Sequence, residues 1–261
     1  MPQTDFNAPR LFVDAPMSTA AVLELDRDQA NYLGNVLRLA PGNTVLVFNG
    51  RDGEWQASIS GRKRADRLTL LTQVRSQDRQ PDLHLVFAPL KHARLDYMVQ
   101  KAVEMGASAL RPVMTRYTQV SRINLERMRA NVIEAAEQCG ILNLAVVHEP
   151  ATLAQYLADR DQDRRLLFCD EHAPVENPIA ALSAIAAGTS PGIDLLIGPE
   201  GGFAEEERNT LLRQAKIYRL SLGPRILRAD TAAVAAMTVA QATLGDWAAP
   251  CALPAQVAGG G

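Results

Sequence analysis

The sequence predicts an α/β fold in two parts: a small β-rich barrel at the N-terminus and a larger α/β domain with a mostly parallel sheet. Short segments rich in β-branched residues, separated by turn dipeptides, fill the first part of the chain. From residue 83 onward, apolar strands alternate with helical patterns, as in sheets that helices cover on both faces. The chain has 261 residues, 47% hydrophobic and 21% charged, which excludes wholesale disorder and a fibrous fold.

The N-terminal domain is expected over residues 1–75. Apolar spacing predicts a helix over 28–38. The dipeptides Asn49-Gly50 and Asp52-Gly53 predict tight hairpin turns, because these residues tolerate the positive φ angles that such turns need. Short strands are expected at 11–13, 44–48, 55–59 and 68–74. Several short strands at this spacing indicate a small barrel.

The α/β domain is expected over residues 83–247, after a polar boundary at 77–82. Strands are predicted at 83–88, 109–113, 145–147, 165–169, 193–198 and 218–222. Helices are predicted at 95–103, 125–139, 205–215 and 231–247, with further helical stretches after residues 147 and 169. We expect the tail, 248–261, to be disordered, because it holds two prolines and ends in three glycines.

Composition and spacing exclude several classes of protein. No apolar run reaches the ~18 residues that a membrane span needs. The first residues lack the pattern of a secretory signal, so we expect a cytoplasmic protein without a membrane partner. Cys139, Cys169 and Cys251 are odd in number and far apart, which indicates neither a disulfide framework nor a zinc site. The four histidines are scattered, and we expect no metal.

Charge is unevenly distributed along the chain, although the formal net charge is only −2. Residues 60–131 hold fourteen Lys and Arg but only six Asp and Glu, so this stretch carries +8 and the rest −10. A basic region in a nearly neutral protein is typical of a phosphate-binding face or of a solvated surface without a partner. Charge alone does not choose between the two.

The most informative motif is a glycine-rich turn that follows a buried strand, with the residues Ile197, Gly198, Pro199, Glu200, Gly201 and Gly202. Ligands of open α/β sheets bind at such carboxyl ends of strands. The turn lacks the glycine spacing of dinucleotide- and phosphate-binding loops, and Pro199 removes a backbone donor. The three glutamates at 205–207 would also repel a phosphate. The motif therefore favours a neutral or cationic ligand, unless it is only a strand-to-helix turn.

A second Gly-Pro turn, at Gly223, follows the strand predicted at 218–222. Ile226 and Leu227 lie between two arginines, which indicates a loop with one buried and one charged side. Asp230 or the residue after it is expected to cap the next helix. Two such turns after two parallel strands can together form one pocket.

The segments LLIGPEGGF (195–203) and LSLGPRILRADTA (220–232) together closely resemble the RsmE family of 16S rRNA uridine-N3 methyltransferases, in the SPOUT superfamily. The resemblance spans almost the whole chain. It includes PRLFV (9–13), NVLRLAPGNTVLVFNG (35–50) and GEW (53–55) of a PUA-like RNA-binding barrel. It also includes KHARLDYMVQKAVEMGA (91–107) and EAAEQCG (134–140).

This resemblance implies an α/β domain with a deep trefoil knot that holds S-adenosylmethionine. It also implies a homodimer with the active site shared across the interface, to which the helix at 231–247 would contribute. The partner would be 16S rRNA within the 30S subunit. By match, the cofactor-binding residues are Ile197, Gly198, Pro199, Glu200, Gly201, Gly202, Leu220, Leu222, Gly223, Ile226, Leu227 and Arg228.

The reaction implied by the resemblance assigns roles to three residues. Uracil N3 carries a proton and becomes a nucleophile only when that proton leaves. Arg228 would stabilise the charge that develops on the uracil oxygens. Asp230 or Glu200 would accept the proton. Each carboxylate also has a structural alternative, a helix cap for Asp230 and a turn residue for Glu200.

Phosphate contacts are expected from basic side chains, which supply affinity rather than sequence choice. The candidates are Arg10, Arg38, Arg51, Arg62, Lys63, Arg64, Lys91, Arg94 and Lys101. For any single one of them, a plain surface charge is the alternative.

The sequence departs from the family pattern at three places. Ala229-Asp230-Thr231 stands where the family commonly has Thr-Glu-Thr, Ile141 stands where it often has arginine, and residues 159–174 match no motif. Two other functions therefore stay open. One is a knotted methyltransferase that acts on another RNA site or on a ribose oxygen. The other is an RNA-binding protein without turnover, such as a ribosome-assembly factor.

Overall fold

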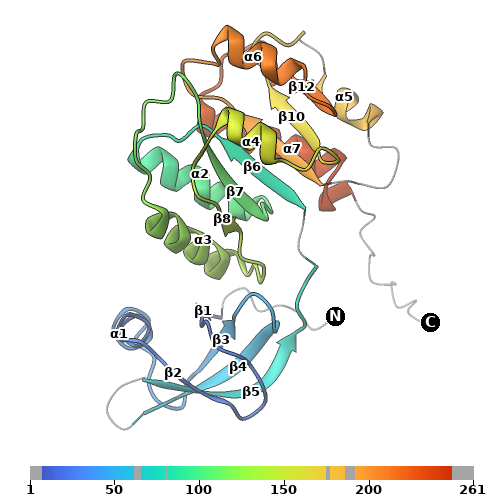
Figure 1. Cartoon of the computed structure of the whole chain (residues 1–261). Coiled ribbons are helices and arrows are strands. Elements are labelled where there is room, and N and C mark those ends of the chain that lie inside the picture. The colour runs from blue at the N-terminus through green and yellow to red at the C-terminus, as the bar shows by residue number, and fades with distance from the viewer. Residues whose placement is uncertain (1–7, 62–65, 80–81, 175–176, 186–191, 249–261) are drawn as a thin grey trace, which may run out of the picture. The chain divides into compact units, whose positions relative to one another are not determined.

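The computed structural model describes residues 8–61, 66–79, 82–174, 177–185 and 192–248 (Figure 1). It divides into two compact units. The first comprises Met1–Gln80, Val99–Ser108 and Asn124–Val147, and the second Pro81–Met98, Ala109–Ile123 and His148–Gly261. Helix α2 (His92–Glu104) is divided between them. The predicted domain ranges, 1–75 and 83–247, stay predictions, and most of the predicted tail, 249–261, lies outside the described residues.

A five-stranded sheet builds most of the first unit. Its order is β1-β3-β4-β5-β2, with β1 parallel to β3 and the other pairs antiparallel. The strands are β1 (Arg10–Phe12), β2 (Val22–Glu24), β3 (Thr44–Phe48), β4 (Glu54–Ser60) and β5 (Arg67–Arg75). The four strands predicted here are confirmed, whereas β2 was not predicted. Alternate residues such as Val45, Val47, Ala57 and Ile59 form its hydrophobic core.

The helical segment of this unit changes type along its length. Helix α1 (Arg27–Asn31) begins at the N-cap Asp26, whose side chain and Gln29 form a capping box. The next residues, Tyr32–Val36, form a π-helical turn, in which the Leu37 N–H donates to the Tyr32 carbonyl over 2.9 Å. Leu33, within this turn, is fully buried. The single helix predicted over 28–38 is therefore corrected to an α-helix followed by a π-helical turn. The first unit also contains α3 (Leu125–Cys139) and β8 (Val146–Val147).

A parallel sheet builds the second unit, as the alternating pattern predicted. Its strands run in the order β12-β10-β11-β6-β7, and every adjacent pair is parallel. These strands are β6 (Leu83–Phe87), β7 (Ala109–Met114), β10 (Arg165–Cys169), β11 (Ile193–Ile197) and β12 (Ile217–Leu220). The short strand β9 (Ala151–Thr152), which was not predicted, pairs with β7. The helices of this unit are α4 (Leu153–Asp159), α5 (Pro178–Ala184), α6 (Glu205–Leu212) and α7 (Ala229–Thr243), followed by the short η2 (Asp246–Ala248).

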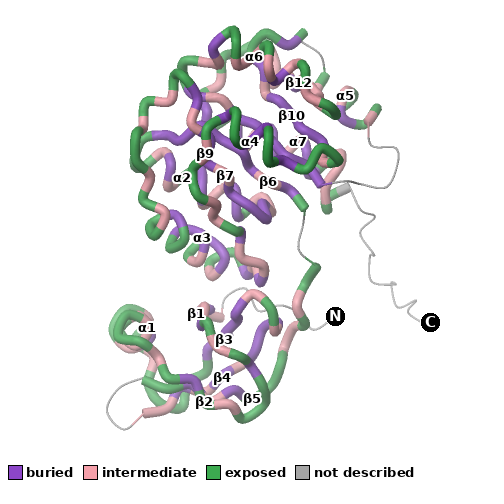
Figure 2. Tube along the Cα trace, viewed as in Figure 1, coloured by how far each residue is buried: buried purple, intermediate pink, exposed green. Residues whose placement is uncertain are grey.

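Helices cover the sheet of the second unit on both faces. Val86, Phe168 and Leu196 point to one face, where they pack with residues of α4 and α6. Their neighbours along the strands point to the opposite face by the alternation of strand side chains. There α7 packs against β11 and α5. Figure 2 shows the result: the central strands are buried, and the outer sides of the helices are exposed.

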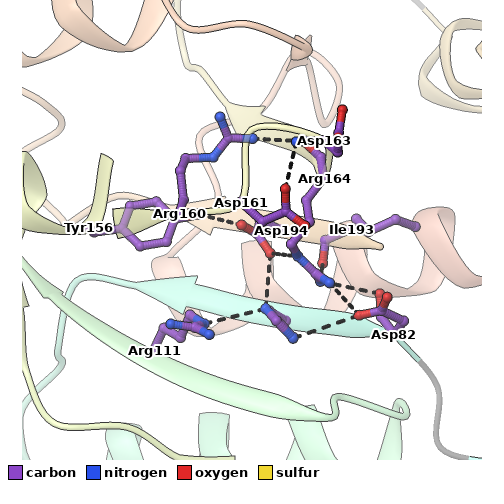
Figure 3. A network of polar contacts seen from close by, with 10 residues as sticks. Asp82, Arg111, Tyr156, Arg160, Asp161, Asp163, Arg164, Ile193 and Asp194 are labelled. Carbon is purple, nitrogen blue, oxygen red and sulfur yellow. Dashed lines mark hydrogen bonds and ion pairs between the residues drawn. The ribbon is translucent and has the colours of Figure 1, made fainter. Parts of the chain in front are cut away.

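A buried polar network joins the amino ends of the parallel strands (Figure 3). Its centre is Asp194 of β11, which is 1% exposed. Asp194 accepts hydrogen bonds from the Tyr156 hydroxyl and from Arg164 Nε, both at 2.7 Å. His84 Nδ1 lies 3.0 Å away on the neighbouring β6, and Arg164 also pairs with Asp82. One carboxylate thus links β11 and β6 to α4 and to Arg164, the residue before β10.

The network sets the protonation of its members. Burial alone would raise the pKa of Asp194, but hydrogen bonds from His84, Arg164 and Tyr156, together with the charge of Arg164, lower it to about 2. Burial and the neighbouring Asp194 carboxylate raise the pKa of Tyr156 well above its ordinary value. Asp194 is therefore ionised and Tyr156 neutral at physiological pH.

We expect Asp194→Asn to lower the free energy of unfolding by about 3 to 5 kcal/mol, because it removes one partner of a buried ion pair. The folded-state pKa of Asp194 lies below its ordinary value of 3.8, so its contribution is complete above that value and is lost as the pH falls toward 2. Urea unfolding from pH 7 down to pH 2 measures both effects. The gap between wild type and variant should narrow toward the acidic end.

The matched control is Asp14→Asn, which breaks the exposed Arg51–Asp14 pair. Its side chains are 53% and 72% exposed, so stability should change little. An equal loss in both variants would contradict the role of Asp194.

Candidate functional site

A cavity of about 400 Å³ lies at the carboxyl ends of β10, β11 and β12, within the second unit. The two predicted Gly-Pro turns form much of its wall. Eleven of the twelve residues predicted to bind the cofactor line it: Ile197, Gly198, Pro199, Glu200, Gly202, Leu220, Leu222, Gly223, Ile226, Leu227 and Arg228. Gly201 does not line it. Of the predicted catalytic residues, Glu200 and Arg228 line the cavity and Asp230 does not.

The first turn needs glycine at two positions for different reasons. At Gly198, a Cβ atom would lie 2.5 Å from Cε2 of Phe203, which folds back over the turn. The Phe203 ring also meets Phe168 edge-to-face, with centroids 5.2 Å apart, so it cannot easily give way. Gly202 adopts a φ of +71°, in the left-handed region. These constraints give the turn one shape.

The second turn presents cationic and apolar groups at the rim. Gly223 has a φ of +95°, and the side chain of Ile226 is fully exposed. Arg225 and Arg228 are exposed, and among the described residues neither forms an ion pair. Arg228 is the residue before helix α7, which begins at Ala229. The helix starts two residues earlier than predicted, so neither Asp230 nor Thr231 is its N-cap.

Arg94 joins the two carboxylates that were predicted as proton acceptors. It comes from α2, and its Nε and Nη2 atoms each donate to Asp230 over 2.9 Å in a bidentate pair. Its Nη1 atom donates to Glu200 Oε1. The three side chains are 29%, 15% and 44% exposed in the order Arg94, Asp230 and Glu200. Arg94 lies 106 residues before Glu200 and 136 residues before Asp230 in the chain. The structure therefore brings the two carboxylates together through a residue that is distant in the sequence.

The paired arginine changes the electrostatics of Asp230. Hydrogen bonds from Arg94 hold the pKa of Asp230 below its ordinary value, with help from the backbone N–H of Thr231. The same hydrogen bonds raise the pKa of Arg94. Both oxygens of Asp230 are occupied by donors, whereas one oxygen of Glu200 carries the Arg94 contact.

The cavity wall also holds a polar cluster that sequence reasoning missed. Asp170, 4% exposed, accepts hydrogen bonds from Arg208 at 3.0 and 3.2 Å and from Arg219 at 2.7 Å. Burial would raise the pKa of Asp170, but the hydrogen bonds from Arg208 and the other donors hold it below its ordinary value. Glu171 and His172 complete this wall. Their position directly after β10 is the signal that would have found them.

The basic residues predicted to contact phosphate have different surroundings. Arg10 pairs with Glu54 over 2.8 Å, and both side chains are 2% exposed, so its guanidinium has a structural partner rather than a free surface. Arg51 pairs with Asp14, and Lys101 pairs with Glu104 over 2.7 Å. Arg38 and Lys91 are exposed. Arg62, Lys63 and Arg64 lie outside the described residues.

The cavity suits an organic ligand with both apolar and charged parts. Its strand ends and second turn supply leucine and isoleucine side chains, and its rim supplies arginines and the Glu171 and Glu200 carboxylates. Removal from water raises the pKa of the Cys169 thiol to about 12, so this lining residue stays a neutral thiol. Within the described ranges, no group of three His, Cys, Asp or Glu could hold a metal ion. No helix of the described part is long and apolar enough to cross a membrane.

Comparisons with known proteins match both parts of the chain. Residues 77–241 match the family described as RNA methyltransferase domain, and residues 25–66 match the one described as RNA methyltransferase PUA domain. A protein of Rickettsia conorii named ribosomal RNA small subunit methyltransferase E is 31% identical over 230 residues. That match covers 87% of this chain and 93% of the relative.

Two solved structures share the fold over the same span. The ribosomal RNA small subunit methyltransferase E of Neisseria gonorrhoeae, bound to S-adenosyl methionine, is 26% identical with a TM-score of 0.79. A protein of Legionella pneumophila, in complex with the bound cofactor SAM, is 28% identical with the same TM-score. Each match covers 92% of this chain and 99% of the other.

We expect Gly198→Ala to destabilise the protein by about 1 to 3 kcal/mol, because the new methyl group overlaps the Phe203 ring. Phe203→Leu removes the ring, so the double variant should lose less stability than the sum of the two single changes. Urea unfolding of the four proteins measures this coupling. Gly34→Ala is the control, since a Cβ atom there meets nothing within 4 Å. Strict additivity at Gly198 and Phe203 would contradict the assigned contact.

We expect Arg94→Met to raise the pKa of Asp230 toward its ordinary value of 3.8, because the lowering hydrogen bonds are lost. Carboxyl-carbon NMR of aspartate-labelled protein follows the titration. Asp163, whose pKa is lowered by its hydrogen bond with Lys216, is the internal control and should not move. An unchanged Asp230 titration would show that Arg94 does not hold this carboxylate in solution.

Proposed function

Because this chain belongs to the RsmE family of RNA methyltransferases, we propose that it transfers a methyl group from S-adenosylmethionine to N3 of a specific uridine in 16S rRNA. The observation that supports this most directly is the cavity between the two Gly-Pro turns, with a bridged pair of carboxylates at its edge. The cavity holds apolar and charged groups, as a ligand with an adenine ring, a sulfonium and an amino-acid end requires.

The cofactor supplies an activated methyl group on its sulfonium, and the methyl passes to N3 while the sulfur keeps the electron pair of the broken bond. The protein has to position the uracil and remove the N3 proton. Ile197, Leu220 and Leu222 offer apolar surface to the cofactor, and Gly198 and Gly202 allow the backbone to approach it closely. Glu171 and Arg208, which also line the cavity, have the charges to pair with an ammonium and a carboxylate.

Glu200 is the proton acceptor in this proposal. It lines the cavity, its side chain is 44% exposed, and Arg94 contacts one of its oxygens. Asp230 is a poor base, because its pKa is lowered and both its oxygens already accept hydrogen bonds from Arg94. Asp230 therefore serves to hold Arg94 against Glu200.

Arg228 stabilises the negative charge that forms on the uracil oxygens when N3 loses its proton. Its guanidinium is exposed at the cavity rim and has no ion-pair partner among the described residues, so it is available to a substrate. Arg225 is its neighbour on the same rim and the natural second candidate.

Further parts of the proposal concern assembly. The chain works as a homodimer in the cytoplasm and acts on 16S rRNA within the 30S subunit, and exposed basic residues such as Arg38 and Lys91 contact phosphates. The chain segment after β12 forms a trefoil knot. The strand order supports this, because β12 lies beside β10 although the chain reaches it through β11.

Methyl transfer from labelled S-adenosylmethionine to 30S subunits that lack this modification tests the function. Nucleoside mass spectrometry of the digested RNA should show N3-methyluridine. A different methylated nucleoside would replace the proposed target, and cofactor binding without any methylation would favour an RNA-binding protein without turnover.

In the same assay, we expect Glu200→Gln to lower kcat by about 100-fold or more, because general-base catalysis contributes on that order. Arg228→Ala should also lower kcat by about 100-fold, as the loss of other groups that stabilise developing charge does. Asp230→Asn should lower kcat less than Glu200→Gln does. Glu205→Gln, an exposed glutamate at the start of α6, is the control and should match wild type. A larger loss in Asp230→Asn than in Glu200→Gln would reverse the assignment.

A further inference from the structure

Gly201 is the one residue of the first glycine turn that the cavity does not explain. Its φ angle is not in the left-handed region, so its backbone does not require glycine. The space beside it is narrow, because a Cβ atom at Gly201 would lie 3.2 Å from Cβ and 3.7 Å from Cγ of Tyr117, and the tyrosine would have to shift by a few tenths of an ångström. The missing side chain of Gly201 thus makes room for a tyrosine that comes from the loop after β7.

The loop that carries Tyr117 is held firmly at its base. The Thr118 N–H donates to the Thr115 carbonyl over 3.1 Å, which closes a β-turn with Arg116 and Tyr117 at its centre. The Thr118 hydroxyl oxygen accepts from the Thr115 N–H and also contacts the Thr115 hydroxyl, both at 2.9 Å. The Arg116 N–H donates to Glu207 of α6 over 2.8 Å. Tyr117 therefore projects from a fixed turn.

The Tyr117 side chain itself is open to solvent. It is 48% exposed, and among the described residues its hydroxyl has no hydrogen-bond partner. Burial and a satisfied hydroxyl, which usually explain a tyrosine on a fixed turn, are both absent. Tyr117 therefore offers an exposed aromatic face beside the glycine turn that carries Glu200.

We propose that Tyr117 is the stacking platform for the uracil that is methylated, which rests on the proposed function. A base can react at N3 only when it leaves its stack, and single-stranded bases are held by stacking on aromatic side chains. Stacking contacts the face of the ring, so the edge that carries N3 and the two oxygens stays open. Glu200 precedes Gly201 in the turn, lines the cavity and is contacted by Arg94, so these two side chains would meet that edge.

This arrangement divides the glycine turn between two ligands. Gly198 and Gly202 belong to the cavity, whereas Gly201 belongs to the substrate side, where it lets Tyr117 approach. Stacking on an aromatic side chain is tolerant of base identity, so Tyr117 contributes affinity and position for the base, and selection of uracil stays with the groups at its edge.

Steady-state methylation of 30S subunits that lack the modification tests the platform. Tyr117→Ala should lower kcat/KM by about ten-fold to a hundred-fold, mainly through KM, as alanine substitution of base-stacking residues does. Tyr117→Phe keeps the ring and should stay within about two-fold of wild type. The affinity for S-adenosylmethionine, measured by calorimetry, should be the same in all three proteins, and this also verifies that the variants are folded.

Tyr97→Ala is the matched control, because this tyrosine is 47% exposed and lies on α2. It should retain the wild-type kcat/KM. Tyr117→Trp adds a spectroscopic readout: its extra fluorescence should be quenched when the 30S subunit binds, since stacking on a base quenches indole.

The outcomes separate the two proposals. No methylation by wild type would remove the proposed function itself. If the wild type is active and Tyr117→Ala has the same kcat/KM, the stacking role of Tyr117 is overturned while the proposed function stands. The same holds if Tyr97→Ala loses as much kcat/KM as Tyr117→Ala. A loss in Tyr117→Phe as large as in Tyr117→Ala would assign the role to the hydroxyl and overturn stacking.

Discussion

The second unit depends on the ionised Asp194, which is buried where the parallel strands begin. His84 and Asp194 are register partners on β6 and β11, and Leu166 of β10 is the partner of Asp194 on the other side. A one-residue slip of β11 would turn Asp194 to the opposite face and separate it from Arg164 and Tyr156. Because an unpaired buried carboxylate costs several kcal/mol, the network selects a single register. That register also fixes where the strands end, and therefore where the two glycine turns meet.

At the carboxyl ends of the strands, carboxylates also pair with an arginine, but the side chains are partly exposed to solvent. Arg94 pairs with Asp230 and Glu200 in a part-exposed site, where ion pairs are weaker and more easily exchanged for a substrate. Both oxygens of Asp230 accept hydrogen bonds from Arg94, whereas Arg94 contacts one oxygen of Glu200, which leaves the other oxygen for the proposed role as proton acceptor. The ion pairs thus differ in strength because the carboxylates differ in burial. Asp194, at the amino ends of the strands, is fully buried, whereas Asp230 and Glu200, at the carboxyl ends, are partly exposed.

The sequence predicted the features that have a local signal. The strands at Thr44–Phe48 and Arg165–Cys169 and the helix at Leu125–Cys139 have the predicted bounds, because their apolar patterns are strong and their ends are marked. Strand β2 was missed, since only its central residue is buried and three residues carry no pattern. The pairs Arg94–Asp230 and Arg10–Glu54 join residues 136 and 44 positions apart, so charge read along one sequence cannot find them. The resemblance predicted that Arg10 contacts RNA, and it carries no information on the burial of this side chain against Glu54.

The roles of the glycines show how far a motif can be interpreted without coordinates. Within one motif, Gly202 is required by its φ angle and Gly198 by the Phe203 ring, whereas Gly201 leaves room for Tyr117 to pack closely. In the sequence all three are simply glycine, and the resemblance assigns all three to binding of one cofactor. Only backbone conformation and spatial neighbours distinguish them, and Tyr117, the neighbour of Gly201, comes from a loop more than eighty residues earlier in the chain. A short glycine-rich turn can therefore serve two ligands, because each missing side chain leaves room on a different side of the backbone.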